Sequence, residues 1–175
     1  MYKLLKLLTG AAIALSASGA SIERGQTSIN PRDLIGTWEW VTNKNLSSGE
    51  IDSIAAKRIA WVAYTGTHNM YLSMEKNRPV RTRDELAKLS PEERMKVSYG
   101  YVWNEKNQTI FTGTGTTYTL EGNKITYTNQ IALSPGGIGR VGSETIVRVD
   151  RTTLIIHRPP NSSGVVIEET FRRLD

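Results

Sequence analysis

The residues best suited to chemistry in this chain are one histidine, one glutamate, two tyrosines and one arginine. They are His157, Glu169, Tyr71, Tyr127 and Arg140. A histidine and a glutamate that share a cavity can transfer a proton, since apolar walls raise a carboxyl pKa toward neutrality. In the alternative interpretation Glu169 pairs with Arg173 or a threonine hydroxyl, and His157 is a residue of the rim. The sequence leaves both interpretations open.

Metal, phosphate and nucleophile chemistry have little support. The two histidines, His68 and His157, belong to opposite ends of the predicted architecture, and the chain has no cysteine; we therefore predict no metal site. The segment Gly137-Ile138-Gly139-Arg140 does not lead from a strand into a helix, so it is not a phosphate-binding loop. No serine stands in a nucleophile elbow. We expect no cofactor.

The N-terminus has the pattern of a bacterial signal peptide. Lys3 and Lys6 precede a mostly apolar run over 7–15, and Ser18-Gly19-Ala20 matches a cleavage site. The apolar run is too short to cross a bilayer as a mature helix, so we expect no transmembrane segment. Export permits disulfides, but the absence of cysteine excludes them. We predict a signal peptide over 1–20 and a periplasmic or secreted protein.

Composition favours one β domain. The net charge is +5 over the whole chain, and the charges are interspersed without a basic block, which argues against a nucleic-acid partner. Abundant Thr, Tyr, Val and Ile with fifteen Gly are typical of β structure. We predict a linker over 21–32 and a single domain over 33–175. The oligomeric state is not predicted.

Eight strands are predicted from period-two alternation between turn signals. They span 34–41, 57–64, 68–74, 109–120, 124–133, 144–149, 153–157 and 165–174. Between the third and fourth strands, two short helices are expected over 82–89 and 91–97. The second helix has a strong start, because Ser90 can cap it with Pro91 and Glu93 behind. This insert is either a lid over the barrel mouth or a cap on one flank.

The lengths of the connections alternate. The turns at Gly66, Gly122 and Arg151 are tight, whereas the connections over 43–56, 75–108, 134–141 and 158–164 are long. In an antiparallel meander, alternate connections lie at the same end. The pattern therefore predicts a closed all-β, eight-stranded, up-and-down barrel with one end shut by hairpins and one open mouth.

The first strand carries a recognisable motif, Leu34-Ile35-Gly36-Thr37-Trp38-Glu39-Trp40-Val41. Its Gly-x-Trp resembles the lipocalin signature, and 89–94 and 131–135 resemble the bacterial lipocalin-like domain family. The resemblance implies that Trp38 plugs the shut end beneath an arginine of the last strand, with Gly36 beside it. Hairpin arithmetic assigns that role to Arg173. The resemblance also implies a small-molecule cavity, and it transfers no catalytic motif.

Assumed hairpin registers assign each strand's inward face. For the last three strands the predicted inward residues are Thr145, Val147, Ile155, His157, Ile167, Glu169, Phe171 and Arg173. Around Gly122 they are Phe111, Gly113, Gly115, Thr117, Ile125, Tyr127, Asn129 and Ile131, with the two glycines leaving room for a cavity. Around Gly66 either Ile59, Trp61, Tyr71 and Ser73 point inward, or Val62, Tyr64, Met70 and Leu72 do. We favour the first of these two sets because Trp and Tyr suit a ligand cavity.

These expectations lead to a binding hypothesis and two alternatives. The first is an exported barrel that binds a small, largely apolar ligand, a hydrophobic or amphipathic molecule. The predicted ligand-binding residues are Trp40, Trp61, Tyr71, Phe111, Tyr127, Arg140, His157 and Glu169. Core packing is an equal alternative for Trp40 and Trp61. The second hypothesis is a cyclase, isomerase or hydrolase in which His157, Glu169 and a tyrosine hydroxyl converge. The third is recognition of a macromolecule through the mouth loops.

Overall fold

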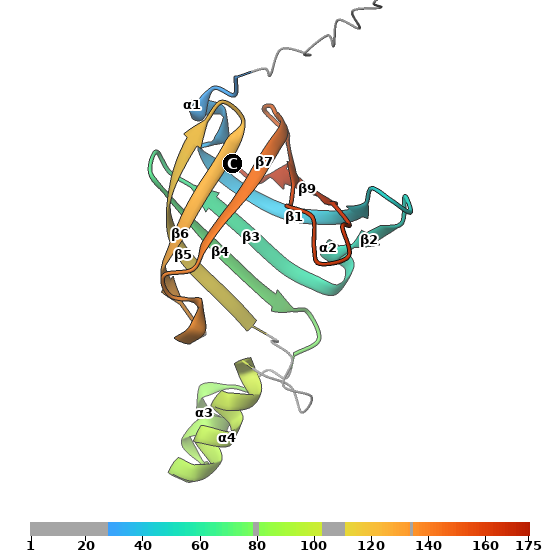
Figure 1. The fold of residues 1–175 in the computed structure, drawn as a ribbon. Coiled ribbons are helices and arrows are strands. Elements are labelled where there is room, and N and C mark those ends of the chain that lie inside the picture. Colours follow the sequence, from blue (N-terminus) through green and yellow to red (C-terminus); the bar gives the residue numbers. More distant parts are fainter. Residues whose placement is uncertain (1–27, 79–80, 103–110, 134) are drawn as a thin grey trace, which may run out of the picture.

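A computed structural model describes residues 28–78, 81–102, 111–133 and 135–175. Its strands form one antiparallel sheet in the order β2-β1-β3-β4-β5-β6-β7-β8-β9, and β1 also pairs with β9 and closes the barrel. The eight barrel strands are β1 (Gly36–Asn45), β3 (Arg58–Tyr64), β4 (His68–Glu75), β5 (Phe111–Glu121), β6 (Lys124–Ala132), β7 (Val141–Val149), β8 (Thr153–His157) and β9 (Ile167–Arg173). This confirms the predicted barrel (Figure 1). The predicted signal peptide lies outside the described residues.

One short strand lies outside the barrel proper. β2 (Ile51–Ser53) pairs only with the outer half of β1, opposite residues 42–44. A short helix, α2 (Ile54–Lys57), then leads into β3, and a 3-10 turn, η1 (Pro135–Gly137), follows β6. At the shut end, α1 (Pro31–Leu34) precedes β1 and begins at Asn30, whose side chain accepts a hydrogen bond from the Arg32 backbone N–H. These elements lengthen the mouth and cover the shut end.

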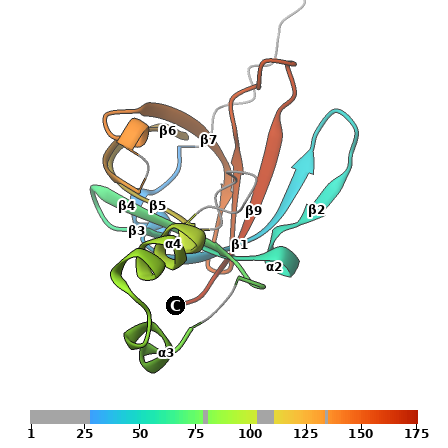
Figure 2. The same ribbon diagram turned by 90° about the horizontal axis from the view of Figure 1, so that it is seen from below.

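The predicted helical insert is present between the third and fourth barrel strands. It consists of α3 (Arg83–Ala87) and α4 (Pro91–Val102). The expected cap forms, because the Glu93 N–H donates to Ser90 Oγ at 3.2 Å and the Ser90 N–H donates to Glu93 Oε2 at 2.7 Å. In Figures 1 and 2 the two helices lie beyond the barrel, on the side of β3–β5. None of the side chains over 81–97 is buried.

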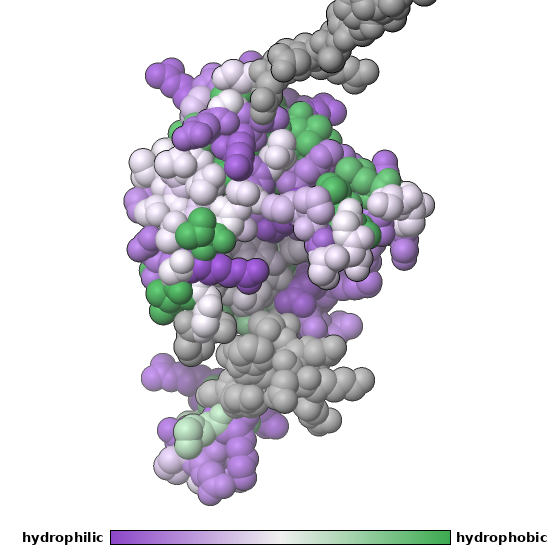
Figure 3. All heavy atoms as spheres, in the orientation of Figure 1, coloured by the Kyte–Doolittle hydropathy of each residue, from purple (hydrophilic) through white to green (hydrophobic). Residues whose placement is uncertain are grey.

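The apolar core fills the shut half of the barrel. Its largest fully buried side chains are Trp38, Leu34, Ile125, Ile146, Leu154 and Ile156. At the mouth end, by contrast, Leu46, Ile51, Ile138 and Val141 are exposed. On the face drawn in Figure 3, apolar residues form separate spots among polar ones. None of the described helices is long and apolar enough to cross a bilayer.

The observed registers overturn several predicted faces. Neither set proposed around Gly66 is right, because Val62 pairs with Tyr71 and Tyr64 with Asn69, which combines members of both sets. Tyr64 is buried, whereas Trp61 is 45% exposed on the outer face. The predicted inward role of Trp61 is therefore wrong.

The two β5 glycines also differ from the prediction. Gly113 and Gly115 lie on the outer face, where a Cβ on Gly113 would meet the exposed side chain of Leu72 at 2.8 Å. The inward residues of β5 are Thr114, Thr116 and Tyr118, and Tyr118 pairs with Tyr127 of β6. The cavity is therefore bordered by threonines, and the glycines do not create its space.

In β7 and β8 the inward and outward sets are exchanged relative to the prediction. Buried, inward residues are Glu144, Ile146, Leu154 and Ile156, so Thr145, Val147, Ile155 and His157 belong to the outer set. The cause is the last hairpin, in which His157 pairs with Glu168 and not with Val165 as assumed. For β9 the prediction is right, since Glu169 and Phe171 are buried inside and Arg173 lies on the same face.

Candidate functional site

The shut end is organised by one arginine. The Arg173 guanidinium carbon lies 4.2 Å from the centre of the Trp38 ring, as a cation–π contact. Its Nη1 and Nη2 donate to the carbonyl oxygens of Ile35 and Asp33 at 2.9 and 2.6 Å, and Trp38 Nε1 donates to the Leu34 carbonyl at 2.9 Å. The predicted contact between Arg173 and Trp38 is therefore present.

Gly36 makes room for this arrangement. Its φ of +138° is a backbone conformation that residues with side chains rarely adopt, and a Cβ there would lie 2.5 Å from Arg173 Nη1. The glycine of the Gly-x-Trp motif thus allows the arginine to reach the carbonyl groups before β1. The contacts of the shut end are those of barrel closure.

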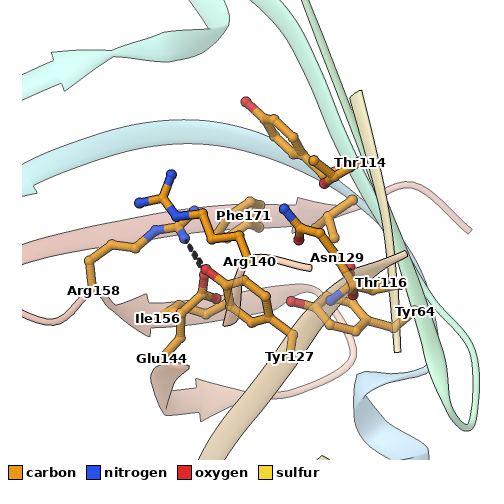
Figure 4. Close-up of a pocket in the computed structure, with 13 residues that line it drawn as sticks. Tyr64, Thr114, Thr116, Tyr127, Asn129, Arg140, Glu144, Ile156, Arg158 and Phe171 are labelled. Atoms are coloured by element: carbon orange, nitrogen blue, oxygen red, sulfur yellow. Dashed lines mark hydrogen bonds and ion pairs between the residues drawn. The ribbon is translucent and has the colours of Figure 1, made fainter. Parts of the chain in front are cut away.

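Beyond this plug the barrel encloses a cavity of about 320 Å³, at the small end of the range for ligand pockets. Figure 4 shows the residues around it. The apolar members are Val62, Ile156 and Phe171. The polar members are Tyr64, Asn69, Tyr71, Thr114, Thr116, Tyr127, Asn129, Arg140, Glu144 and Arg158. Ten of the thirteen lining residues carry a polar side-chain atom, while the tyrosine rings add apolar surface to the wall. The wall is therefore mixed, with more polar groups than a cavity for a largely apolar ligand needs.

Three charged side chains form a cluster on one side of the cavity. Arg158 forms ion pairs with Glu144 through Nη1 and with Glu169 through Nε, the latter at 3.0 Å. Arg158 Nη1 also donates to the Tyr127 hydroxyl at 3.3 Å. The side chains of Glu144 and Glu169 are only 8% and 5% exposed, so one guanidinium balances two buried carboxylates. Glu169 Oε2 is buried without a partner among the described residues.

Burial and this cluster shift the pKa values around the cavity. Desolvation raises the pKa of Glu169 above its ordinary value, although Arg158 opposes the shift. Burial by itself lowers the pKa of Arg158, but the two carboxylates outweigh burial and raise it. Desolvation, reinforced by Glu144, raises the pKa of Tyr64 and of Tyr127. Both phenols are therefore neutral hydrogen-bonding groups at physiological pH.

Gly142 determines how Tyr127 lies. The two residues are directly opposite each other on β7 and β6, and a Cβ on Gly142 would lie 2.5 Å from the Tyr127 hydroxyl oxygen. The tyrosine ring therefore crosses over the glycine toward Arg158 and Glu144. A side chain at position 142 would displace the ring from the charged cluster.

Arg140 is held at the edge of the cavity by Asn129. The backbone N–H of Asn129 donates to the Arg140 carbonyl at 3.0 Å, and the Gly139 N–H donates to the Asn129 carbonyl at 2.8 Å. The Asn129 side chain donates to the Gly137 carbonyl at 2.9 Å. These bonds fix the loop after η1 on β6, and Figure 4 shows the Arg140 side chain passing over Tyr127 toward Arg158.

Aromatic rings close the cavity on the β1 side. Trp40 stacks on Phe171 with ring centres 6.1 Å apart and meets the edge of Tyr71 at 6.2 Å. Its Nε1 donates to Asn43 Oδ1 at 3.0 Å. Trp40 thus lies behind the wall that Tyr71 and Phe171 form, and not among the lining residues.

The structure brings some predicted site residues together and separates others. Tyr71, Tyr127 and Arg140 line the cavity, and Glu169 lies inside the barrel beneath Arg158. His157 is outside, where its Nε2 meets Glu168 at 3.0 Å. Phe111 does not line the cavity either; it pairs with Met74 on β4 and lies 5.8 Å from the Arg78 guanidinium. Trp61, His157 and Phe111 are therefore wrong as cavity residues.

Glu144 and Arg158 line the cavity but were not predicted from the sequence, and Tyr64 belonged to the less favoured of the two sets around Gly66. The sequence does carry a signal for the two charged residues, because each alternates with buried apolar residues of its strand. Glu144 is two positions before Ile146 on β7, and Arg158 follows Leu154 and Ile156 of β8 at the same spacing. No group of three or more potential metal ligands occurs among the described residues.

The closed meander with its plugged end and open mouth defines a lipocalin-like barrel. No family model matches the chain, and no curated protein matches it. Among solved structures, the chain is similar to a lipocalin-like protein from Bacteroides uniformis ATCC 8492, with 10% identity and a TM-score of 0.47. An uncharacterized protein from Bacteroides eggerthii DSM 20697 gives 10% identity and a TM-score of 0.45. Each match covers 81% of this chain and 99% of the other.

Proposed function

We propose that the barrel binds a small amphipathic molecule in its cavity. The observation that supports this is a wall that combines an apolar side, at Val62, Ile156 and Phe171, with ten polar side chains. A ligand pocket of this size needs few polar groups to orient its ligand, and here many converge. Several of these groups, among them Glu144, Arg158 and Asn129, have partners within the protein. The Arg140 guanidinium and the Tyr64 hydroxyl have none among the described residues, and the polar part of an amphipathic ligand could bond to them.

The enzyme hypothesis required His157, Glu169 and a tyrosine hydroxyl to lie within hydrogen-bond reach. His157 belongs to the outer face, and the Glu169 oxygen that has a partner is bonded to Arg158. No other observation favours a reaction, so binding is the proposed function.

We further propose that residues 1–20 are removed as a signal peptide, that 21–32 link to the barrel domain over 33–175, and that the protein acts in the periplasm or outside a bacterium. The support is the sequence pattern of the first twenty residues. The mass of the protein recovered from an exporting cell tests it, because cleavage after Ala20 leaves Ser21 as the first residue.

The binding proposal is tested by native mass spectrometry of the exported protein, before and after denaturing extraction. We expect a retained small molecule. Thr114→Phe fills the cavity and should abolish retention, while Thr119→Phe, on the exposed face of the same strand, is the matched control and should not. Retention of the same molecule by Thr114→Phe at the wild-type level would contradict binding in the cavity.

A further inference from the structure

One of the two arginines that line the cavity lies outside the ion pairs of the charged cluster. The charged lining residues are Arg140, Glu144 and Arg158, and Glu144 is already paired with Arg158. The Arg140 guanidinium has no hydrogen-bond or ion-pair partner among the described residues. Within the described part of the wall, Arg140 is therefore the charged group still free to bind a ligand.

The loop contacts described above fix the backbone from which this guanidinium extends. Asn129 forms hydrogen bonds with the backbone of Gly137, Gly139 and Arg140. Little backbone ordering is therefore needed when a ligand binds. The side chain alone has to settle on the ligand. An arginine fork matches the geometry of a carboxylate or a similar oxyanion.

The other polar groups around the cavity are compatible with an anion. The Tyr64 hydroxyl has no hydrogen bond among the described residues, and its pKa is raised by burial, so it remains a donor. Glu169 carries the charge that would oppose an anion. It lies behind Arg158 and is bonded to it in an ion pair of 3.0 Å, and burial raises its pKa.

The rest of the wall limits the body of the ligand. A cavity of about 320 Å³ suits a compact molecule better than a long chain. The apolar contacts come from Val62, Ile156 and the ring of Phe171, with the rings of Tyr71 and Tyr127 close by. Such a wall packs well against a planar, apolar body.

We infer that the ligand is a compact organic acid, whose anionic group binds Arg140 and whose apolar or aromatic body packs against Val62, Ile156 and Phe171. This inference rests on the proposed binding function and adds the chemical class of the ligand. It assigns to Arg140 the role of selecting the charge of the ligand.

Three probes of one size and different charge test the inference: phenylacetate, 2-phenylethanol and phenethylamine. Their affinities for the full protein are measured by isothermal titration calorimetry at low ionic strength. We expect phenylacetate to bind most tightly and phenethylamine most weakly. Arg140→Gln should weaken phenylacetate about tenfold, the loss of one charged hydrogen-bonding contact, and leave 2-phenylethanol unchanged. Arg140→Lys should recover part of the affinity.

Arg151→Gln is the matched control, because it removes the same charge from an exposed turn at the shut end. It should change no affinity. Equal binding of phenylacetate and 2-phenylethanol, or preference for the amine, would overturn the acid assignment while supporting the proposed function. Failure of all three probes to bind would count against the binding function itself. Circular dichroism of each variant verifies that the barrel is folded.

Discussion

Two arginines of the same barrel have opposite surroundings. Arg173, at the shut end, contacts the Trp38 ring and two backbone carbonyls, none of which titrates. Arg158, beside the cavity, contacts two buried carboxylates and a tyrosine hydroxyl. Arg173 is thus bonded to backbone groups, whereas Arg158 is bonded to two carboxylate side chains and a phenol.

This difference indicates that the contacts of Arg173 stabilise the fold, whereas the cluster around Arg158 belongs to the cavity proposed to bind a ligand. Arg173 bonds to two backbone carbonyls through Nη1 and Nη2, and its Nε is buried without a partner among the described residues. The cluster around Arg158 has two carboxylates for one cation and an unpartnered Glu169 oxygen, so its energy depends on protons and on the contents of the cavity. We therefore expect mutations at the two arginines to differ in pH dependence more than in size.

The largest expected effect is that of Arg158→Met. It leaves Glu144 and Glu169 buried without a counter-ion, and should lower the free energy of unfolding by about 3 kcal/mol at pH 8. This is the lower end of the usual range, because the Arg158 side chain is 37% exposed. The loss should shrink at pH 5.5, because burial raises the pKa of Glu169 and lower pH favours its protonated form. Urea denaturation at both pH values measures it, with Arg151→Met as control; an equal loss at both would contradict the charge argument.

Arg173→Met should be next, at about 2 kcal/mol, from one cation–π contact and two hydrogen bonds. Unlike Arg158→Met, its effect should be the same at pH 5.5 and pH 8, because none of those partners titrates in that range. The same denaturation experiments provide the measurement. A pH-dependent loss at this position would remove the distinction between the two ends.

Two tyrosine substitutions extend the comparison between the shut end and the cavity, and each should lower the free energy of unfolding by about 1 kcal/mol. Tyr118→Phe removes a 2.6 Å bond to the Thr65 carbonyl near the shut end, and Tyr127→Phe removes the hydroxyl between Glu144 and Arg158. Both should destabilise, but only Tyr127→Phe should also alter probe binding in the cavity. Thermal unfolding and calorimetry distinguish them. An equal effect of both on binding would mean that the cavity extends to the shut end.

The smallest change in the free energy of unfolding is expected for Glu169→Gln, and the test is whether this substitution stabilises or destabilises the protein. The folded-state pKa of Glu169 lies above its ordinary value of 4.5, so the folded protein binds this proton more tightly than the unfolded chain does. That stability is complete below pH 4.5 and is lost as pH rises through the folded-state pKa. Glutamine should therefore make the protein more stable than wild type at pH 8, and this gain should fade toward pH 4.5. Lower stability at pH 8 would show that the Arg158 pairing outweighs burial.

The sequence predicted the barrel well, for a local reason. Strand positions follow from alternation and turn residues, and the lengths of the connections determine which end is shut. The helix start at Ser90 is likewise encoded within a short motif. These features depend on residues near in sequence or on a simple count of strands, whereas the contact of Arg173 with Trp38 was implied by the resemblance to lipocalins.

The residues that line the cavity were predicted less well, because they depend on the exact register of each hairpin. Tyr64 pairs with Asn69, Glu121 with Lys124 and His157 with Glu168. Each assumed register differs from these by an odd number of residues. A shift by an odd number of residues moves every side chain of a strand to the other face. His157 and Trp61 therefore lie on the outer face of the barrel and not on the predicted inner face.

The amino-acid sequence by itself thus determined the order of the strands, the plugged end and the helical insert, because these arise from local patterning and turn chemistry. Only the tertiary structure decided that Glu144 and Arg158 meet Glu169 inside, and that Arg140 reaches the cavity from the loop held by Asn129. Those contacts join neighbouring strands and loops, but they depend on the register of each hairpin, and on burial and charge pairing that exist only once the barrel is closed.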